Sequence, residues 1–177
     1  MLDVLKQWQH ERVPLVIRKA TSSDTELVIS SRLDFLRDVR GTGFEASSDL
    51  TARTRSFVIA ESDGGRLHTW VAEEAERFAG IVSLLLWPRP PRPEDSRVFD
   101  GYIINMFVPP DRQRQGIGKQ LLERCLASAP ELGIGRFVLH TTDEGRQLYE
   151  STGFRHTQKW MHLAVADFDD QPNEDRA

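Results

Sequence analysis

Gln113-Arg114-Gln115-Gly116-Ile117-Gly118 is the stretch that decides how this chain folds, because it joins an apolar strand segment to a helix. Val98–Val108 predicts a strand that ends at two prolines, and Ile117–Ala129 carries its apolar residues on one helical face. Glycines at the junction permit positive φ and a close approach between backbone and ligand. The free N–H groups and the dipole at a helix start attract an anion. Three side chains add positive charge nearby: Arg112, Arg114 and Lys119. The junction therefore predicts a pyrophosphate site.

The spacing of this junction excludes two common phosphate-binding loops. A Walker A loop needs Gly-Lys-Ser/Thr, which does not follow Gly116. The dinucleotide fingerprint needs a third glycine three residues after the second, where Leu121 stands. A plain helix-start turn at Gly116 and Gly118 stays open as the alternative to a phosphate site.

The junction resembles the signature Gln/Arg-x-x-Gly-x-Gly/Ala of the GNAT superfamily of N-acetyltransferases. Two companion motifs stand in the family's order and spacing. Before the junction, the strand ends in Asn105-Met106-Phe107-Val108-Pro109-Pro110, which is similar to Asn-Leu-Tyr-Val-x-Pro. After it, Leu148-Tyr149-Glu150-Ser151-Thr152-Gly153-Phe154 is similar to Leu-Tyr-x-x-x-Gly-Phe. The resemblance is specific over residues 98–165 and looser over 13–97.

This resemblance implies an N-acetyltransferase with acetyl-CoA (coenzyme A) as co-substrate, which acetylates an amine by direct attack in a ternary complex. In the family the long strand splays from its parallel neighbour, and the pantetheine arm lies along its backbone. A strand N–H stabilises the oxyanion that forms on the acyl carbonyl. The residues implied in donor binding are Met106, Phe107, Val108, Gln113, Arg114, Gln115, Gly116, Ile117, Gly118, Lys119 and Thr142.

Tyr149 aligns with the residue that usually serves the family as general acid. A neutral phenol is protonated at pH 7 and can give its proton to the departing thiolate of CoA. Packing on the donor without any proton transfer is the alternative for this side chain. Thr142, seven residues earlier, stands where the family often has Asn.

The general base is left open, because Ile104 stands where many relatives carry Glu. Arg32 falls on the apolar face of a helix predicted to begin at a capping box formed by Ser23 and Glu26. Such an arginine extends to the surface or pairs with a buried carboxylate, and substrate binding is the alternative. The histidines lack a metal-type spacing such as His-x-x-x-His, so no metal site is predicted. The candidate bases are Asp34, Asp38, Glu45, Asp100, His140 and His162.

The acceptor is not fixed by the sequence beyond a small-molecule or peptide amine. Two other functions stay open beside acetyl transfer. One is a transferase for another short acyl-CoA, and the other is a non-catalytic acyl-CoA-binding regulatory module.

Periodicity along the chain predicts a mixed α/β fold. Consecutive strands in the middle predict antiparallel pairing, and the later strand–helix–strand step predicts a parallel crossover. With the resemblance, this gives a GNAT-like, mainly antiparallel central sheet of six or seven strands flanked by about four helices, with a splayed strand pair binding the cofactor. The expected strands are Val13–Ala20, Leu67–Ala72, Phe78–Leu86, Val98–Val108, Arg136–His140 and Trp160–Val165. The expected helices start after Ser23 and Ser47-Ser48 and span Ile117–Ala129 and Glu144–Thr152.

The length of 177 residues predicts a single acetyltransferase domain over 13–166, with an N-terminal extension (1–12) and an acidic tail (167–177). The net charge of −4 argues against nucleic acid as a partner. The longest apolar run, Ile81–Trp87, is too short to span a membrane. The N-terminus lacks a signal pattern, so a cytoplasmic location is expected. The resemblance implies a homodimer.

Overall fold

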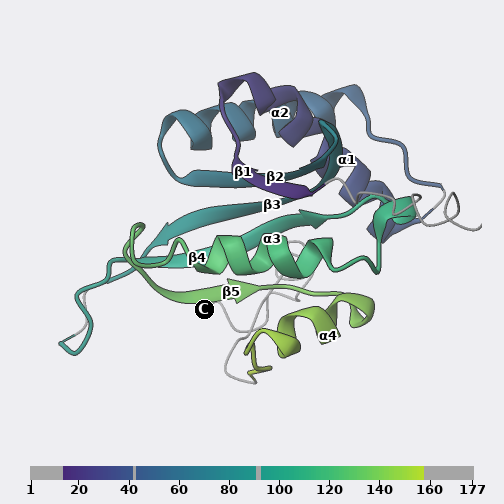
Figure 1. The fold of residues 1–177 in the computed structure, drawn as a ribbon. Coiled ribbons are helices and arrows are strands. Elements are labelled where there is room, and N and C mark those ends of the chain that lie inside the picture. The colour runs from purple at the N-terminus through teal and green to yellow at the C-terminus, as the bar shows by residue number, and fades with distance from the viewer. Residues whose placement is uncertain (1–13, 42, 91–92, 158–177) are drawn as a thin grey trace, which may run out of the picture.

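The computed structural model describes residues 14–41, 43–90 and 93–157, which form one sheet with helices on both faces (Figure 1). Five strands lie in the order β1-β2-β3-β4-β5. The elements in chain order are β1 (Leu15–Lys19), the 3-10 helix η2 (Ser22–Asp24), α1 (Thr25–Arg40), α2 (Ser48–Asp63), β2 (Leu67–Glu74), β3 (Arg77–Pro88), β4 (Phe99–Phe107), the 3-10 helix η3 (Pro110–Arg112), α3 (Ile117–Leu126), β5 (Ile134–Leu139) and α4 (Asp143–Ser151).

The strands pair in chain order, antiparallel from β1 to β4 and parallel between β4 and β5. A two-residue turn joins β2 to β3, and both of its residues, Ala75 and Glu76, have positive φ, as in a type I′ turn. α3 is the crossover that makes the β4–β5 pair parallel. Pairing between β4 and β5 ends at Ile103 and Leu139, whereas β4 continues to Phe107. The two strands therefore separate at this end of the sheet.

The hydrophobic core has two layers, one on each face of the sheet. α1 and α2 cover one face, and α3 covers the other (Figure 1). The adjacent residues Ile81 and Val82 of β3 are both fully buried, but they point to opposite faces. Ile81 shares a cluster with Val28 of α1 and Val58 of α2, whereas Val82 shares one with Leu121 of α3. A central strand covered on both faces explains the continuous apolar run in the sequence.

The start of α1 differs from the predicted capping box of Ser23 and Glu26. Thr21 and Asp24 form a box instead, at the start of the 3-10 helix η2 that leads into α1, and the Thr21 N–H donates to Asp24 Oδ2 at 2.7 Å. The Asp24 carboxylate is fixed in this place because the Arg18 guanidinium of β1 donates to both of its oxygens at 2.8 Å. This hydrogen-bonded ion pair holds the pKa of Asp24 well below its usual range. Glu26 forms an ion pair with α2.

The predicted mixed α/β sheet with four α-helices is confirmed, but the count of six or seven strands is not. Five strands lie within the described residues, and the strand predicted at Trp160–Val165 falls outside them. The predicted N-terminal extension (1–12) and acidic tail (167–177) also fall outside the described residues. The predicted domain bounds therefore stay a prediction.

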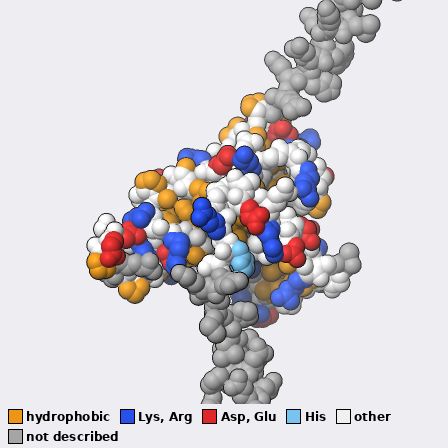
Figure 2. Space-filling view, turned by 90° about the horizontal axis from the view of Figure 1, so that it is seen from below, with side chains coloured by type: hydrophobic (Ala, Val, Ile, Leu, Met, Phe, Trp, Pro, Cys, Tyr) orange, Lys and Arg blue, Asp and Glu red, His pale blue; other side chains and the backbone are white. Residues whose placement is uncertain are grey.

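Charged side chains of both signs are interspersed on the face shown in Figure 2. This distribution agrees with a net charge of only −4 over the whole chain. Among the helices that the structure describes, none is long and apolar enough to cross a membrane.

Candidate active site

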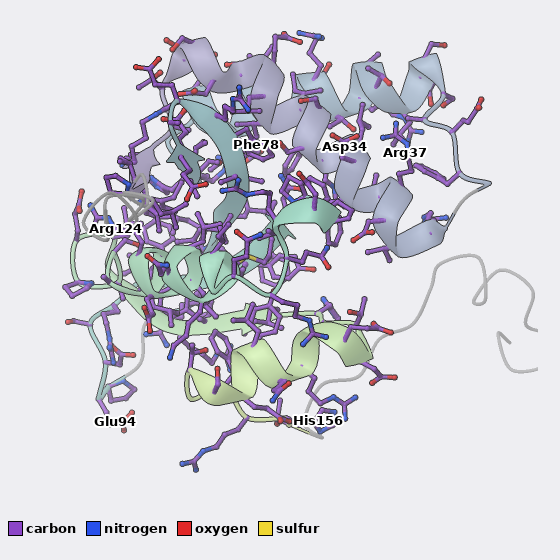
Figure 3. The ribbon with its side chains drawn as sticks, turned by 45° about the vertical axis from the view of Figure 1, so that its right-hand side comes forward. Asp34, Arg37, Phe78, Glu94, Arg124 and His156 are labelled. Atoms are coloured by element: carbon purple, nitrogen blue, oxygen red, sulfur yellow. The ribbon has the colours of Figure 1, made fainter. Side chains whose placement is uncertain are left out.

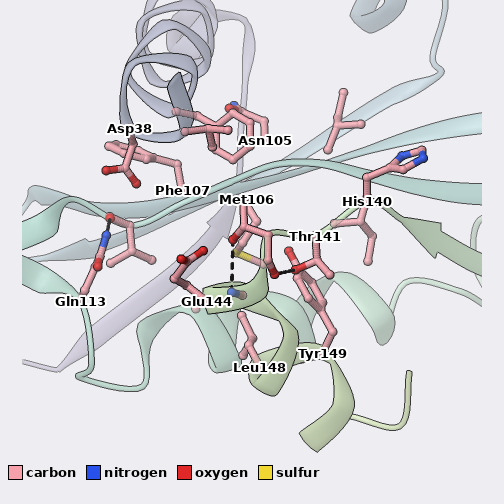
Figure 4. Close-up of a pocket in the computed structure, with 18 of the residues that line it drawn as sticks. Asp38, Asn105, Met106, Phe107, Gln113, His140, Thr141, Glu144, Leu148 and Tyr149 are labelled. Carbon is pink, nitrogen blue, oxygen red and sulfur yellow. Dashed lines mark hydrogen bonds between the residues drawn. The ribbon is translucent and has the colours of Figure 1, made fainter. Parts of the chain in front are cut away.

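A cavity of about 830 Å³ opens where β4 and β5 separate (Figure 4). Four parts of the chain line it: α1, β4 with the loop that follows it, the first turn of α3, and the segment from the end of β5 into α4. Its size is typical of a site for a small molecule. The cavity thus lies at the place where the resemblance predicts the donor.

β4 contains a bulge at Asn105, beside the cavity. On β3, Ser83 pairs with Ile104 and Ile81 pairs with Phe107, so β4 has one residue more than β3 between these pairs. Asn105 has a φ of 53°, in the left-handed region that asparagine adopts more readily than most residues. Bulges of this kind redirect the strand that follows and occur often next to active sites.

The bulge changes the direction in which the end of β4 faces. Residues two apart on a regular strand share a face, yet Ile104 packs with the α1–α2 layer and Met106 with the α3 layer. Asn105 lies between them and is only 4% exposed. Within the described residues, neither its amide nitrogen nor its amide oxygen has a hydrogen-bond partner. A buried polar group without a partner costs about 1–3 kcal/mol, so this amide favours a polar ligand in the cavity.

The loop between β4 and α3 has the backbone geometry of an anion site. Arg114 and Gly116 have positive φ values of 61° and 79°. Left-handed residues of this kind form concave arrangements of N–H groups that bind anions. Gly116 is the N-cap of α3, and Gly118 follows in its first turn. A Cβ at Gly118 would lie 3.4 Å from Leu148 Cδ2, so the absence of a side chain keeps this part of the cavity wall open.

Only part of the predicted positive charge faces the cavity. Arg114 lines it. Arg112 forms an ion pair with Glu74 of β2, and Lys119 Nζ lies 3.9 Å from a carboxylate oxygen of Glu123 on α3. The attraction for a phosphate at this loop therefore comes from Arg114 and from the N-terminus of α3.

The predicted donor-binding residues fall into two groups. Those that line the cavity are Met106, Phe107, Val108, Gln113, Arg114, Gly118 and Thr142. Those that do not line it are Gln115, Gly116, Ile117 and Lys119. The Ile117 side chain is 3% exposed and lies in the core under α3. Gln113 Nε2 donates to the Val108 carbonyl at 3.1 Å and so ties the loop to the end of β4.

Tyr149 of α4 lines the cavity and is only 8% exposed (Figure 4). Its ring meets the Phe154 ring edge-on, with the ring centres 5.8 Å apart. Burial, with a smaller contribution from Cys125, raises the pKa of the phenol to about 12. The side chain therefore keeps its proton at neutral and mildly alkaline pH.

The first turn of α4 is held by hydrogen bonds at its start. Thr142 is the N-cap, and its Oγ1 accepts from the Gly145 N–H at 3.3 Å. Hydrogen bonds from the Glu144 N–H and the Thr142 hydroxyl lower the pKa of Glu144. A Cβ at Gly145 would lie 2.7 Å from Thr141 Oγ1, so this position requires glycine. This N-cap fixes the position of α4 beside the cavity, and with it the position of Tyr149.

A tyrosine and a histidine meet at the point where β4 and β5 separate. The Tyr102 hydroxyl lies 2.9 Å from His140 Nδ1, and both residues line the cavity. The Tyr102 ring packs on Trp87 of β3, with the ring centres 4.8 Å apart. Arg32 of α1 lines the cavity as well. Tyr102 belongs to the same strand as Ile104, two residues earlier and on the regular side of the bulge, so these two side chains share a face.

Of the six candidate bases, the structure brings two to the cavity, Asp38 and His140. Asp34 is bonded to Arg37 on α1 (Figure 3) and does not line it. Asp100 is buried and forms an ion pair with Arg136 of β5.

The other two candidate bases do not contribute to the described cavity. Glu45 is exposed and does not line it. His162 falls outside the described residues. Among the residues that the structure describes, no group of three His, Cys, Asp or Glu side chains could hold a metal ion.

Sequence reasoning missed Tyr102 and the bulge at Asn105. The available signal for Tyr102 was its position two residues before Ile104, which places a phenol on the face that lacks the expected carboxylate. The bulge has a weaker signal, since Asn is only one of the residues that tolerate a left-handed φ. The pairing of Tyr102 with His140 depends on the register between β4 and β5, which the sequence does not show.

Comparison with known proteins supplies the family. The model of the acetyltransferase (GNAT) family matches residues 33–154. Human N-acetyltransferase 8 is 30% identical over 113 residues, which cover 62% of this chain and 46% of that protein, so the match spans about half of that relative's length. The uncharacterized N-acetyltransferase YsnE of Bacillus subtilis is 29% identical over 115 residues, covering 62% of this chain and 67% of that protein.

A solved structure extends this likeness over most of the fold. The crystal structure of a predicted acetyltransferase with acetyl-CoA from Clostridium acetobutylicum has a TM-score of 0.78 and 27% sequence identity. The match covers 87% of this chain and 98% of that chain. The match to the family model runs from within α1 to the end of α4. It includes every residue that lines the cavity except Arg32. The chain belongs to the acetyltransferase (GNAT) family.

Proposed function

We propose that this chain is an N-acetyltransferase that moves the acetyl group of acetyl-CoA to a small-molecule or peptide amine by direct attack in a ternary complex. The observation that carries the proposal is that one cavity joins the open wall at Gly118, the free end of β4 and the buried phenol of Tyr149. The relative from Clostridium acetobutylicum, which was solved with acetyl-CoA, supports the choice of donor.

The residues present fit a CoA-type donor. The pyrophosphate would lie against the N–H groups from Arg114 to Lys119, where the left-handed backbone and the start of α3 favour an anion. The pantetheine arm would lie along Met106–Val108, which have no β5 partner. The unpaired amide of Asn105 offers a polar contact at the inner end of that path.

In the proposed reaction, the amine nitrogen attacks the acetyl carbonyl carbon. The new C–N bond forms, the C–S bond breaks, and its electron pair leaves on the CoA sulfur. An N–H at the end of β4 stabilises the negative charge on the carbonyl oxygen. The Tyr149 hydroxyl gives its proton to the sulfur, and solvent restores that proton after the product leaves. The raised pKa of Tyr149 ensures that the proton is present at the start of each turnover.

We assign the removal of the amine proton to the Tyr102–His140 pair. Ile104 cannot accept a proton, and Tyr102 is the hydroxyl on the same face of β4. The Tyr102 oxygen accepts the amine proton while its own proton passes to His140 Nδ1, which lies 2.9 Å from that oxygen. The phenol remains neutral after this exchange, and the charge resides on the imidazole, which returns the proton to solvent.

The variant Tyr149→Phe tests the acid role. It keeps the ring that packs on Phe154 and removes only the proton donor. We expect kcat for CoA release from acetyl-CoA with an amine panel to fall by about 10²- to 10⁴-fold. Calorimetry should show CoA binding within about threefold of the wild-type value, since uncharged packing is retained.

Three outcomes would overturn parts of this function. An unchanged kcat in Tyr149→Phe would show that this residue only packs on the donor. CoA binding without any transfer across the amine panel would favour the acyl-CoA-binding module. Faster turnover of propionyl-CoA than of acetyl-CoA would identify a different short-chain donor. The homodimer and the cytoplasmic location stay predictions.

A further inference from the structure

The acceptor side of the cavity contains an arginine without an acidic partner. Arg32 lies on the face of α1 that also brings Phe35 and Val39 into the cavity lining. Its guanidinium carbon is 5.2 Å from the centre of the Phe35 ring, and the side chain is half-buried. Within residues 14–41, 43–90 and 93–157, no carboxylate forms an ion pair with Arg32. Of the roles that the sequence left open for this arginine, an ion pair with a buried carboxylate is not seen in the described part of the chain.

The environment of Arg32 differs from that of its neighbour Arg37, which is exposed and bonded to Asp34. Burial lowers the pKa of Arg32, because the guanidinium loses contact with water there. A partly desolvated cation gains more from an anionic ligand than a fully hydrated one does. The cavity therefore offers an unmatched positive charge to whatever binds beside α1.

The position of Arg32 assigns this charge to the acceptor rather than to the donor phosphates. Its electrostatic neighbour is Tyr102, the hydroxyl paired with His140. Tyr102 lies on β4 and Val108 just after its end at Phe107, six residues later, a separation of up to roughly 20 Å in extended backbone. Figure 4 shows His140 and Gln113, the first residue of the phosphate loop, on opposite sides of the cavity. Arg32 thus lies beside the proposed proton acceptor, away from the α3 N-terminus.

We propose that the acceptor is an amine that also carries a carboxylate, and that the Arg32 guanidinium binds this carboxylate. The proposal rests on the proposed acetyl transfer, and it names the substrate class for the same cavity. A guanidinium matches a carboxylate with two parallel N–H donors, which fixes orientation as well as charge. Bound in this way, the acceptor's amine can reach the Tyr102–His140 pair.

A carboxylate fits this end of the cavity better than a phosphate does. Arg32 supplies a single positive charge, and two carboxylates, Asp38 and Glu144, line the same cavity. A doubly charged phosphate would keep one uncompensated charge in this environment, which costs more than the neutral pair formed with a carboxylate. Figure 4 places Asp38 on the side of Gln113, so it does not neutralise Arg32.

The test compares acceptors that differ only in their negative group. The full chain is given acetyl-CoA with 4-aminobutyrate or 4-aminobutyramide, with glycine or glycinamide, and with L-phenylalanine or L-phenylalaninamide. Glucosamine 6-phosphate serves as the phosphate arm. We expect the wild type to prefer the carboxylate member of at least one pair. In Arg32→Met, kcat/KM for that member should fall by about 10- to 100-fold, mainly through KM, as expected for a lost charge-assisted hydrogen bond.

Two controls separate binding from folding. The amide member should lose far less kcat/KM than the carboxylate member in Arg32→Met, because it makes no charge-assisted bond. The ratio between the two members does not depend on the fraction of folded protein, so a partly unfolded variant still gives a valid result. Arg37→Met, on the same helix but outside the cavity lining, should keep the wild-type ratio.

The outcomes distinguish this inference from the proposed function. Equal carboxylate-to-amide ratios in the wild type and in Arg32→Met would overturn the inference while leaving acetyl transfer intact. A wild-type preference for glucosamine 6-phosphate over every carboxylate would overturn it as well. Calorimetry of the same acceptors with the CoA-loaded chain gives a readout without turnover. If the carboxylate binds in an Arg32-dependent way but no acetyl group is transferred, the inference is supported and the proposed function is contradicted. If no carboxylate binds to the wild type, the inference is overturned.

Discussion

The hydrogen bond between Tyr102 and His140 joins two strands at the point where their pairing stops. Neither residue alone indicates a function. Tyr102 is an aromatic residue of a strand that packs on Trp87, and His140 follows the last residue of β5. Together they place an exchangeable proton on the face of β4 where Ile104 offers none. Two residues that act as one unit should lose their effect together.

A double-mutant cycle at this pair measures that coupling. We expect Tyr102→Phe and His140→Gln each to lower kcat by about 10²-fold or more, as expected for the loss of a general base. The double variant should be no slower than the slower single variant, because either change already interrupts the proton exchange. Steady-state CoA release checks this, and Tyr102→Phe keeps the ring on Trp87 as an internal packing control. Multiplicative losses in the double variant would show that the two residues act independently.

At this scale the sequence predicted the residues that belong to motifs and missed those that depend on contacts. Gly118 and Tyr149 were identified because their neighbours along the chain make a recognisable pattern, and both line the cavity. Arg32 was expected to extend to the surface or to pair with a buried carboxylate, with substrate binding as the alternative. The absence of such a partner among the described residues follows from what packs across from α1, which no local pattern encodes.

α3 is the element whose start determines what the cavity can accept on the donor side. Gly116 begins the helix with a left-handed residue, and Gly118 keeps its first turn free of a side chain against Leu148. Leu121 and Leu122, three and four residues later on the same face of the helix, are fully buried in the core. Gly118 therefore leaves room for a ligand at the start of an otherwise packed helix face.

Gly118→Leu should fill the space that the glycine leaves at the start of α3. Leucine has a better helix propensity than glycine by roughly 0.8 kcal/mol, so thermal unfolding should show no loss of stability. The added side chain would extend from a Cβ only 3.4 Å from Leu148, into the space proposed for the donor. We expect the Kd for CoA, measured by calorimetry, to rise by at least about tenfold.

Gly118→Ala is the matched control for this prediction. A single methyl group at 3.4 Å makes an ordinary contact, and alanine also occurs at this position of the family signature. CoA binding in this variant should stay within about threefold of wild type. If Gly118→Leu binds CoA as tightly as the wild type, the donor does not pass this wall.

At the scale of elements, most helices and strands were predictable, but one start and one end were not. The capping box formed at Thr21 and Asp24, at the start of η2 just before α1, and the Arg18 guanidinium of β1 holds Asp24 there through a contact that outweighs the local pattern. The hairpin between β2 and β3 is tighter than the gap of residues 73–77 left between the predicted strands, since Ala75 and Glu76 alone make the turn. Both differences depend on specific contacts, Arg18 with Asp24 and the strand pair Glu74 and Arg77, which the sequence pattern does not show.

The whole molecule buries two ionisable groups in the layer between the sheet, α3 and α4. Burial raises the pKa of Cys125 and that of Tyr149 to about 12. The folded state therefore binds these protons more tightly than the unfolded state, in which a tyrosine has a pKa near 10. A group with a raised pKa contributes stability below its unfolded pKa and loses it as the pH rises through the folded value.

The free energy of unfolding should accordingly fall on the alkaline side. For Tyr149 the loss lies between about pH 10 and pH 12 and amounts to about 2 kcal/mol at pH 11.5. Urea unfolding of the wild type and of Tyr149→Phe at pH 9 and pH 11.5 checks this. The wild type should lose about 2 kcal/mol more than the variant, while Cys125 contributes equally to both proteins. Equal losses would show that the phenol is not protected by burial.

At the scale of the whole molecule, the fold class was predictable and the shape of the site was not. The order of strands and helices and the three motifs led to a mixed sheet with a separated parallel pair, which the structure contains. Predicting the shape of the cavity, with its donor end and its acceptor end, would have required the pairing register of β4 with β3 and with β5. Register is set by side-chain packing across strands, and a single sequence does not contain that information in readable form.

The single extra residue at Asn105 reverses the alternation of side chains along β4, so that residues before and after it face opposite layers. Tyr102 and Ile104, before it, face one layer, whereas Met106 and Val108, after it, pack with the other. Mutations that adapt the enzyme to a new acceptor can therefore accumulate in the first half without altering the donor path. Acceptor choice and donor binding therefore depend on different parts of one strand. A mutant library restricted to the residues before Asn105 should change the preferred acceptor while CoA binding is retained.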